Sequence, residues 1–279
     1  MTGRITGATR VLGIIGDPIA QVRAPEVWTG LFRLNGVDAV CVPMQVEASG
    51  LASFLEAAKA LRNFIGLIVT IPHKPAALKQ ARSPSERARR VGAANILRLD
   101  DDREWVADIV DGIGFVGALQ MRGKSVADRR ALVVGAGGVG SAIAFAVAEA
   151  GAAEVTVFDI AAARAADLAR RIGATGVPAR VGAADAAEFD LVVNASPMGM
   201  KPDDPLPIAL DRLRPEAIVG DVVVHPPMTK LLTAARERGC YVQPGTHMMD
   251  AQCAAMAKFF GFDGGDWSPA AIAKVVGGA

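Results

Sequence analysis

The sequence predicts an α/β protein of two domains. Short β-branched strands alternate with alanine-rich or amphipathic helices along the chain, which is the pattern of sheets covered by helices. The 279 residues suffice for two domains of ordinary size, and 51% of them are hydrophobic. Aromatic residues are few, while alanine, valine and glycine dominate, as in parallel sheets packed under helices. We place the join between the domains near residues 108–118.

The first alternating run predicts strands and helices up to that join. Strands are expected at residues 10–18, 39–46, 66–72, 94–99 and 104–110, and helices at 24–36, 49–64 and 84–93. Asn35-Gly36 ends the first helix, and Ser49 is the expected cap of the second. Pro72 ends the third strand, and Lys74 follows it in a turn stiffened by prolines on both sides.

The second run starts at residue 129 and again alternates strand and helix. Strands are expected at residues 131–134, 154–159, 189–197 and 217–224, with helices between them. Residues 246–262 are apolar at helical period and predict a final long helix.

Composition excludes several classes of protein. A formal net charge of +1 gives no electrostatic reason to expect nucleic acid or an anionic membrane as partner. The arginines at positions 82, 87, 89 and 90 are expected on a solvated helix face. Residues 131–148 carry no charge over a length that could span a membrane, but their glycines divide them into strand, turn and helix.

The three cysteines point to a reducing environment. Cys41, Cys240 and Cys253 are odd in number and lack the spacing of metal ligands, so we expect neither a disulfide framework nor a metal site. The first ten residues lack the apolar segment of a signal peptide. We therefore expect a cytoplasmic protein.

A glycine-rich turn in the second run predicts a dinucleotide site. Gly135, Gly137 and Gly140 fit G-x-G-x-x-G between a strand and a helix, and the site includes Gly138 and Val139. The first glycine allows a tight turn, the second lets backbone amides approach a pyrophosphate, and the third lets helix and strand pack closely. The next strand ends on Asp159, whose carboxylate would accept hydrogen bonds from ribose hydroxyls and repel a 2′-phosphate. The sequence therefore favours NAD, with NADP as the alternative.

Seven segments, taken in order, resemble the shikimate dehydrogenase family. No single one is specific, but seven in register are. They are GIIGDPIAQVRAP (13–25), VTIPHK (69–74), GAANIL (92–97), DIVDGIGF (108–115), GAGGVGSA (135–142), NASPMGM (194–200) and GTHMMDAQ (245–252).

The resemblance implies the fold and the activity. An N-terminal α/β substrate domain would comprise residues 1–110 and be completed by helices in 247–279, and a C-terminal Rossmann dinucleotide-binding domain would comprise 111–246. The expected activity is NAD(P)-dependent interconversion of a ring hydroxyl and a ketone in shikimate or a quinate-like cyclic hydroxy acid. The expected protein is a monomer or homodimer.

The resemblance also implies roles for single residues. Lys74 and Asp111 match the pair that handles the proton of the reacting hydroxyl. Thr70, Asn95 and Gln252 match residues that bind the substrate. The expected nucleotide contacts outside the glycine loop and Asp159 are Ser196, Val222, Gly245 and Met248.

The substrate loop departs from the family. Where relatives have S-x-S-P, with two hydroxyls that hold the substrate carboxylate, this chain has Val22-Arg23-Ala24-Pro25. An apolar pair cannot donate hydrogen bonds to a carboxylate, so we expect weak activity on shikimate unless Arg23 compensates. Further family polar positions are apolar here, at Ile68, Ile109, Val110 and Val224.

Two other functions stay open at this point. One is a sensor that keeps the fold and the nucleotide without catalysis, which would have no need for both Lys74 and Asp111. The other is a dehydrogenase of folate-type one-carbon units, which would need an aromatic pocket, whereas this chain has one tyrosine. The histidines His73, His225 and His247 lie near these segments and are expected to be structural, with His247 the one most open to another role.

Overall fold

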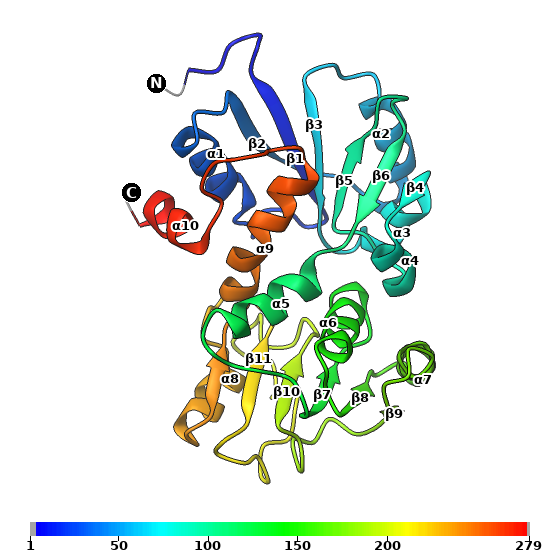
Figure 1. The fold of residues 1–279 in the computed structure, drawn as a ribbon, viewed down its shortest axis with the longest axis vertical. Helices are drawn as coiled ribbons and strands as arrows, with labels where there is room; N and C mark the ends of the chain where they lie inside the picture. Colours follow the sequence, from blue (N-terminus) through cyan, green and yellow to red (C-terminus); the bar gives the residue numbers. More distant parts are fainter. Residues whose placement is uncertain (1–3, 278–279) are drawn as a thin grey trace. The chain divides into compact units, whose positions relative to one another are not determined.

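A computed structural model describes residues 4–277 of the chain and confirms the predicted α/β class. The chain divides into two compact units (Figure 1). The first unit runs to Val110 and resumes at Cys253, and the second unit is Asp111–Gln252. Each unit contains one six-stranded sheet. The sequence-based division returned the chain to the first domain at residue 247, whereas the contacts keep Gln252 in the second unit.

The sheet of the first unit is mixed. Its strand order is β2-β1-β3-β5-β6-β4, with β5 antiparallel to both of its neighbours and the other pairs parallel. The carboxyl ends of β1, β3 and β6 and the amino end of β5 therefore lie at the same end of the sheet. The strands are β1 (Arg10–Gly16), β2 (Ala39–Gln45), β3 (Phe64–Val69), β4 (Ser83–Pro84), β5 (Ile96–Leu99) and β6 (Trp105–Asp108).

Helices cover both faces of this sheet. Alternate residues of a strand point to opposite faces, so Leu12 and Ile14 of β1 pack into one core while Ile15 packs into the other. The first core lies under α1, α10 and the end of α9, and the second lies under α2 and α3. The helices are α1 (Ala24–Leu34), the 3₁₀ turn η1 (Ala48–Gly50), α2 (Leu51–Ala58), α3 (Lys74–Gln80), α4 (Glu86–Val91), α9 (Gly245–Phe259) and α10 (Pro269–Val276).

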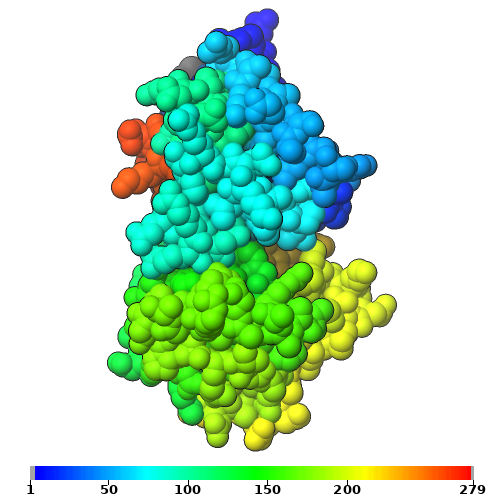
Figure 2. Space-filling view, turned by 90° about the vertical axis from the view of Figure 1, so that its right-hand side faces the viewer, coloured from blue at the N-terminus to red at the C-terminus, as the bar shows by residue number. Residues whose placement is uncertain are grey.

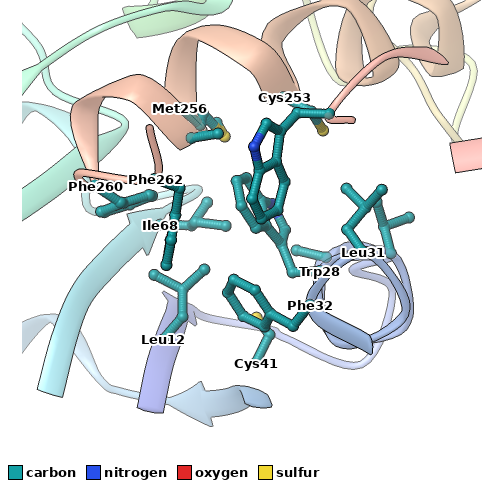
Figure 3. Close-up of a cluster of buried hydrophobic side chains, with 14 of the residues drawn as sticks. Leu12, Trp28, Leu31, Phe32, Cys41, Ile68, Cys253, Met256, Phe260 and Phe262 are labelled. Atoms are coloured by element: carbon teal, nitrogen blue, oxygen red, sulfur yellow. The ribbon is translucent and has the colours of Figure 1, made fainter. Parts of the chain in front are cut away.

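Aromatic rings from both ends of the chain form the first core. Figure 3 shows Trp28 and Phe32 of α1 in one cluster with Met256 and Cys253 of α9 and with Leu12 and Ile68 of the sheet. Trp28 lies with its ring centroid 5.6 Å from that of Phe32 and 5.7 Å from that of Trp267. Burial in this core raises the pKa of the Cys41 thiol to about 12, so the group stays protonated at neutral pH.

The sheet of the second unit is parallel throughout. Its order is β12-β11-β10-β7-β8-β9. From β7 to β9 successive strands are added toward one edge of the sheet, and from β10 to β12 toward the other edge, so the strand order reverses between β7 and β10. In sheets of this kind the ligand binds outside the carboxyl ends of the strands at that reversal. The strands are β7 (Arg130–Val134), β8 (Glu154–Phe158), β9 (Ala179–Val181), β10 (Leu191–Asn194), β11 (Ile218–Asp221) and β12 (Tyr241–Gln243).

Helices also cover both faces of the second sheet. The helices α5 (Asp111–Gln120) and α6 (Gly138–Glu149) pack closely, because a Cβ at Gly112 would lie 2.2 Å from the carbonyl oxygen of Ala142 (Figure 1). Residues of α8 (Lys230–Glu237) fill the core on the other face. Helix α7 (Ala162–Gly173) buries Leu168 and Ile172, and Figure 2 shows its outer side among the exposed residues of this unit.

The structure corrects three local predictions. Ser49 does not cap a helix: it lies in η1, and the N-cap of α2 is Gly50, which has no side chain to donate or accept. The second helix ends at Ala58 rather than 64, because Phe64 is the first residue of β3 and pairs with Val11 of β1. The segment after β3 contains α3, where we expected only a turn.

The uncharged segment 131–148 divides as predicted into β7, a glycine turn and the first part of α6. Within residues 4–277, no helix combines the length and the apolar character needed to cross a bilayer.

Candidate functional site

One end of the first sheet gathers the predicted substrate residues of the first unit. Thr70 directly follows β3, Asn95 directly precedes β5, and Lys74 begins α3 a few residues beyond Thr70. The antiparallel pairing of β3 with β5 brings the first two together, since Val69 donates its amide to the carbonyl of Asn95 over 2.7 Å. Thr70 is held against β1, where its amide donates to the carbonyl of Ile15 over 2.9 Å.

Asn95 ties three segments of the first unit together. Its amide donates to the carbonyl of Asp108 over 3.0 Å, and its side-chain Oδ1 accepts the amide of Val110 over 3.0 Å. The side chain is buried, with 2% exposure. Because Asp111 is the next residue after Val110, this hydrogen bond holds the backbone directly before Asp111.

Lys74 is a buried cation at the start of a helix, not a residue of an exposed turn. Its side chain is 7% exposed, and its carbonyl accepts the amide of Ala94 over 2.9 Å. Pro75 follows at the first turn of α3, where its fixed φ favours the helix and its missing amide hydrogen costs nothing. Pro75, the second residue of α3, therefore favours the helix that begins at Lys74.

Arg87 is a residue whose role the sequence did not reveal. Its Nε donates to the carbonyl of Ile109 over 2.7 Å, and its guanidinium pairs with Asp108 over 2.5 Å. Ser85 donates to the other oxygen of Asp108 over 2.6 Å. The prediction of a solvated arginine face is therefore wrong for Arg87, whose partners lie in the segment leading to Asp111, while the arginines at 82, 89 and 90 are exposed. Partners more than 20 positions away leave no pattern in the sequence.

The predicted substrate loop carries apolar side chains that face the core. Val22 is half-buried and packs against the aromatic core, and Ala24 is 6% exposed at the first turn of α1. Arg23 lies between them at the N-cap position of α1, half-buried. Ile68 also faces the core. Neither Val22 nor Ala24 thus offers a side-chain hydrogen-bond donor in this loop.

The glycine loop of the second unit has the geometry that its motif predicts. Gly135 has φ of +111°, and a Cβ there would lie 2.7 Å from the carbonyl oxygen of Ala195. A Cβ at Gly140 would lie 1.8 Å from the carbonyl oxygen of Gly135. A Cβ at Gly137 would touch no protein atom, so packing does not require glycine there. Gly138 and Val139 begin α6, whose amide groups point out of its N-terminus.

Asp159 lies directly after β8, beside this loop. One carboxylate oxygen accepts the amide of Ala136 in the glycine loop over 2.7 Å, and the other accepts the amide of Ala161 over 2.8 Å. These two hydrogen bonds orient the side chain toward the glycine loop. Ile160, the next residue, is almost fully exposed. These residues fit the adenosine half of a dinucleotide, and the positions directly after the carboxylate carry no positive charge.

The remaining nucleotide positions lie at the ends of β10 and β11 and at the start of α9. Ser196 and Val222 follow those two strands, and the amide of Val222 donates to the carbonyl of Asn194 over 3.0 Å. A Cβ at Gly245 would lie 2.6 Å from the carbonyl oxygen of Val222, so α9 approaches this loop closely. Met248 is buried in the next turn of α9.

Gln252 and Asp111 belong to the second unit. Both are buried, and Gln252 packs on α5, where a Cβ at Gly114 would lie 2.9 Å from its Cβ. The contact at Gly114 explains why this position between α5 and α9 carries no side chain.

The histidines differ in their surroundings. His73 is buried, and its Nε2 forms a 2.6 Å hydrogen bond with the carbonyl of Val46, which is a structural role as predicted. His225 is exposed. The Nδ1 of His247 is buried without a hydrogen-bond partner, and burial together with the nearby charge of Arg122 lowers the pKa of His247. Among residues 4–277, no cluster of three or more His, Cys, Asp or Glu side chains could hold a metal ion.

Two family models match most of the chain. Residues 14–97 match the shikimate dehydrogenase substrate binding domain, and residues 118–197 match shikimate / quinate 5-dehydrogenase.

Curated relatives align over nearly the same length. The chain is 37% identical over 258 residues to shikimate dehydrogenase (NADP(+)) of Acidiphilium cryptum, with 92% of each chain covered. It is 36% identical over 252 residues to shikimate dehydrogenase (NADP(+)) of Rubrobacter xylanophilus, with 88% of each covered.

Solved structures resemble the chain from end to end. Shikimate 5-dehydrogenase of Listeria monocytogenes, in complex with shikimate and NAD, is 30% identical with a TM-score of 0.88 over 99% of each chain. Quinate dehydrogenase of Corynebacterium glutamicum, in complex with NAD, is 32% identical with a TM-score of 0.85 over 97% of this chain and 99% of that one. The ligand-free 5-ketofructose reductase of a Gluconobacter strain is 27% identical with a TM-score of 0.85 over 97% and 98%.

Proposed function

This chain belongs to the shikimate dehydrogenase family, and from that membership we propose that it interconverts a ring hydroxyl and a ketone of a shikimate- or quinate-like acid with a nicotinamide nucleotide. The observation that carries the proposal is the backbone network at one end of the first sheet. There the ends of β3 and β6 and the start of β5 fix Thr70, Lys74 and Asn95 relative to one another. These are the residue types that hold and deprotonate a polyhydroxy compound.

We assign proton transfer at the reacting hydroxyl to Lys74 and Asp111. Oxidation of a hydroxyl releases a proton, and reduction of the ketone requires one, so a positioned group must accept and return it. Both side chains are buried, and a charge acts more strongly in such surroundings than in water. Thr70, Asn95 and Gln252 are assigned to the other hydroxyl groups of the substrate.

The nucleotide is assigned to the second unit. Gly135–Gly140 and the start of α6 would hold the pyrophosphate, and Asp159 would accept the ribose hydroxyls. Ser196, Val222, Gly245 and Met248 would line the nicotinamide end. When bound, the nucleotide supplies or accepts the hydride, and the residues named here bind and orient it.

The proposed activity is tested by incubating the purified protein with shikimate or quinate and either nucleotide. We expect the reduced nucleotide to form, which is followed by its absorbance. Tight nucleotide binding without turnover of any cyclic hydroxy acid would contradict the proposal and support a sensor with the same fold.

We expect NAD to be preferred over NADP, although the curated relatives are NADP(+) enzymes. The carboxylate of Asp159 would repel a 2′-phosphate, and the next two positions are Ile160 and Ala161. Specificity constants for both nucleotides should differ by about 10-fold or more, the scale of one charged hydrogen bond, and Asp159→Ser should reduce the difference. A larger specificity constant for NADP would contradict this assignment. The matched variant Arg164→Ala would then show whether that exposed arginine in the first turn of α7 binds the phosphate.

A second candidate substrate is a polyhydroxy ketone without a carboxylate. The observation that favours it is the apolar pair Val22 and Ala24 in the substrate loop. The similarity to 5-ketofructose reductase makes a neutral sugar ketone a reasonable member of the substrate screen. We further propose that the protein acts in the cytoplasm as a monomer or homodimer.

A further inference from the structure

A buried carboxylate joins two loops of the second unit. Asp221 is the last residue of β11 and is 1% exposed. Its Oδ1 accepts the side-chain amide of Asn194 and the backbone amide of Val223, each over 3.0 Å. Its Oδ2 accepts the hydroxyl of Thr229 over 2.7 Å. The carboxylate thus holds the end of β10, the loop after β11 and the start of α8.

Asn194 extends this network into the neighbouring loop. It is the last residue of β10, and its Oδ1 accepts the hydroxyl of Ser196 over 2.7 Å and the amide of Ser196 over 3.1 Å. Its Nδ2 donates to the carbonyl of Met198 over 2.9 Å and to Asp221. The hydroxyl of Ser196 in turn accepts the amide of Met198 over 3.2 Å.

These loops lie where the parallel sheet receives a ligand. Strands β10 and β11 are neighbours, and β10 pairs with β7, which carries the glycine loop. The glycine loop and Asp159 serve the adenosine half on one side of the reversal. The loops of residues 195–199 and 222–229 therefore border the other half of a bound dinucleotide.

The chemistry of the network requires an acceptor at position 221. A carboxylate only accepts hydrogen bonds when ionised, and here it meets donors from Asn194, Val223 and Thr229. An amide in its place would offer one acceptor oxygen and add a donor that faces other donors. Burial raises the pKa of Asp221 to about 6, although its hydrogen bonds act in the opposite direction. Burying a carboxylate costs desolvation free energy, and well-packed apolar residues could join the two strands without that cost.

We propose that Asp221 is a positioning residue: through Asn194 and Thr229 it holds the two loops in the shape that receives the nicotinamide half of the nucleotide. The inference rests on the proposed function of the second unit. A purely structural role for Asp221 would predict weaker binding of both halves of the nucleotide, whereas the proposed role predicts weaker binding of the nicotinamide half alone.

The experiment compares two ligands that share the adenosine half. ADP contacts the glycine loop and the region of Asp159, whereas NADH also reaches the loops that Asp221 holds. In Asp221→Asn we expect the dissociation constant for NADH to rise by about 10-fold or more, the scale of one hydrogen bond to a charged group, with that for ADP unchanged within about 2-fold. Both constants are measured by calorimetry on the full chain.

A second pair of variants decides the matter if Asp221→Asn does not fold. Thr229→Val removes the hydroxyl while keeping the shape, and should weaken NADH binding more than ADP binding. Thr229→Ser keeps the hydroxyl and should retain most of the NADH affinity. Equal losses of affinity for ADP and NADH, or unchanged NADH affinity in both Asp221→Asn and Thr229→Val, would overturn this inference but not the proposed function. A wild-type protein that binds neither ligand would overturn the proposed nucleotide function and this inference with it.

Discussion

Replacing Lys74 with alanine is expected to lower turnover by about 100-fold or more, the usual contribution of a positioned acid or base. The backbone around Lys74 is fixed by α3 and by Ala94, so the substitution removes the amine while leaving the segment in place. The affinity for the nucleotide should change little, because its proposed contacts lie in the second unit. Steady-state kinetics and nucleotide titration measure the two effects separately.

Two further variants sharpen this experiment. Lys79 lies on the same helix but is exposed, so Lys79→Ala should keep wild-type turnover. Lys74→Arg keeps a positive charge that does not deprotonate, and should be nearly as inactive as Lys74→Ala if proton transfer is the role. Turnover near the wild-type level in Lys74→Ala would remove Lys74 from the mechanism.

Introducing two hydroxyls into the substrate loop is expected to raise the specificity constant for shikimate. Each hydrogen bond to a charged group contributes about 1.5 to 3 kcal/mol, so two missing bonds correspond to roughly 100-fold or more. The double variant Val22→Ser with Ala24→Ser should recover about 10-fold or more of that loss. Pro25 and the helix start are unchanged, and Ala24 already occupies the first turn of α1.

The control for this variant separates hydroxyls from space. Val22→Ala shortens the side chain without adding a donor, and should leave the specificity constant for shikimate low. If the wild-type protein already uses shikimate as efficiently as its relatives, another group holds the carboxylate, and Arg23→Ala should then abolish that efficiency. If the double variant gains nothing, the substrate lacks a carboxylate at this position.

The sequence predicted the local backbone features of the candidate site, because local chemistry determines them. The glycine turn before α6 and the strand directly before Asp159 could be found because glycine and β-branched residues have strong local preferences. Helix α3 was not predicted because it is short and has prolines on both sides of its first residue, Lys74. That pattern is typical of a reverse turn. Short helices are stabilised by packing more than by propensity.

The contacts that fix the site could not be predicted in the same way. Arg87 binds Asp108 and Ile109 through the antiparallel order of β5 and β6, which the sequence does not contain as a pattern. Asn194 and Asp221 left a weaker signal. Each is a polar residue at the end of a buried apolar strand, and together they indicate polar groups at one edge of a parallel sheet.

The aromatic core of the first unit has a consequence for how the chain folds during its synthesis. Trp28 and Phe32 reach their final packing only against Phe260, Phe262 and Trp267, more than 200 positions later in the chain. The second unit needs no residue beyond Gln252 and is continuous in sequence. Domains usually fold in the order in which they leave the ribosome, but the aromatic core of the first unit can be completed only after the second unit has been synthesised. Until residues 253–277 have been synthesised, Trp28 and Phe32 lack the aromatic partners that surround them in the finished fold.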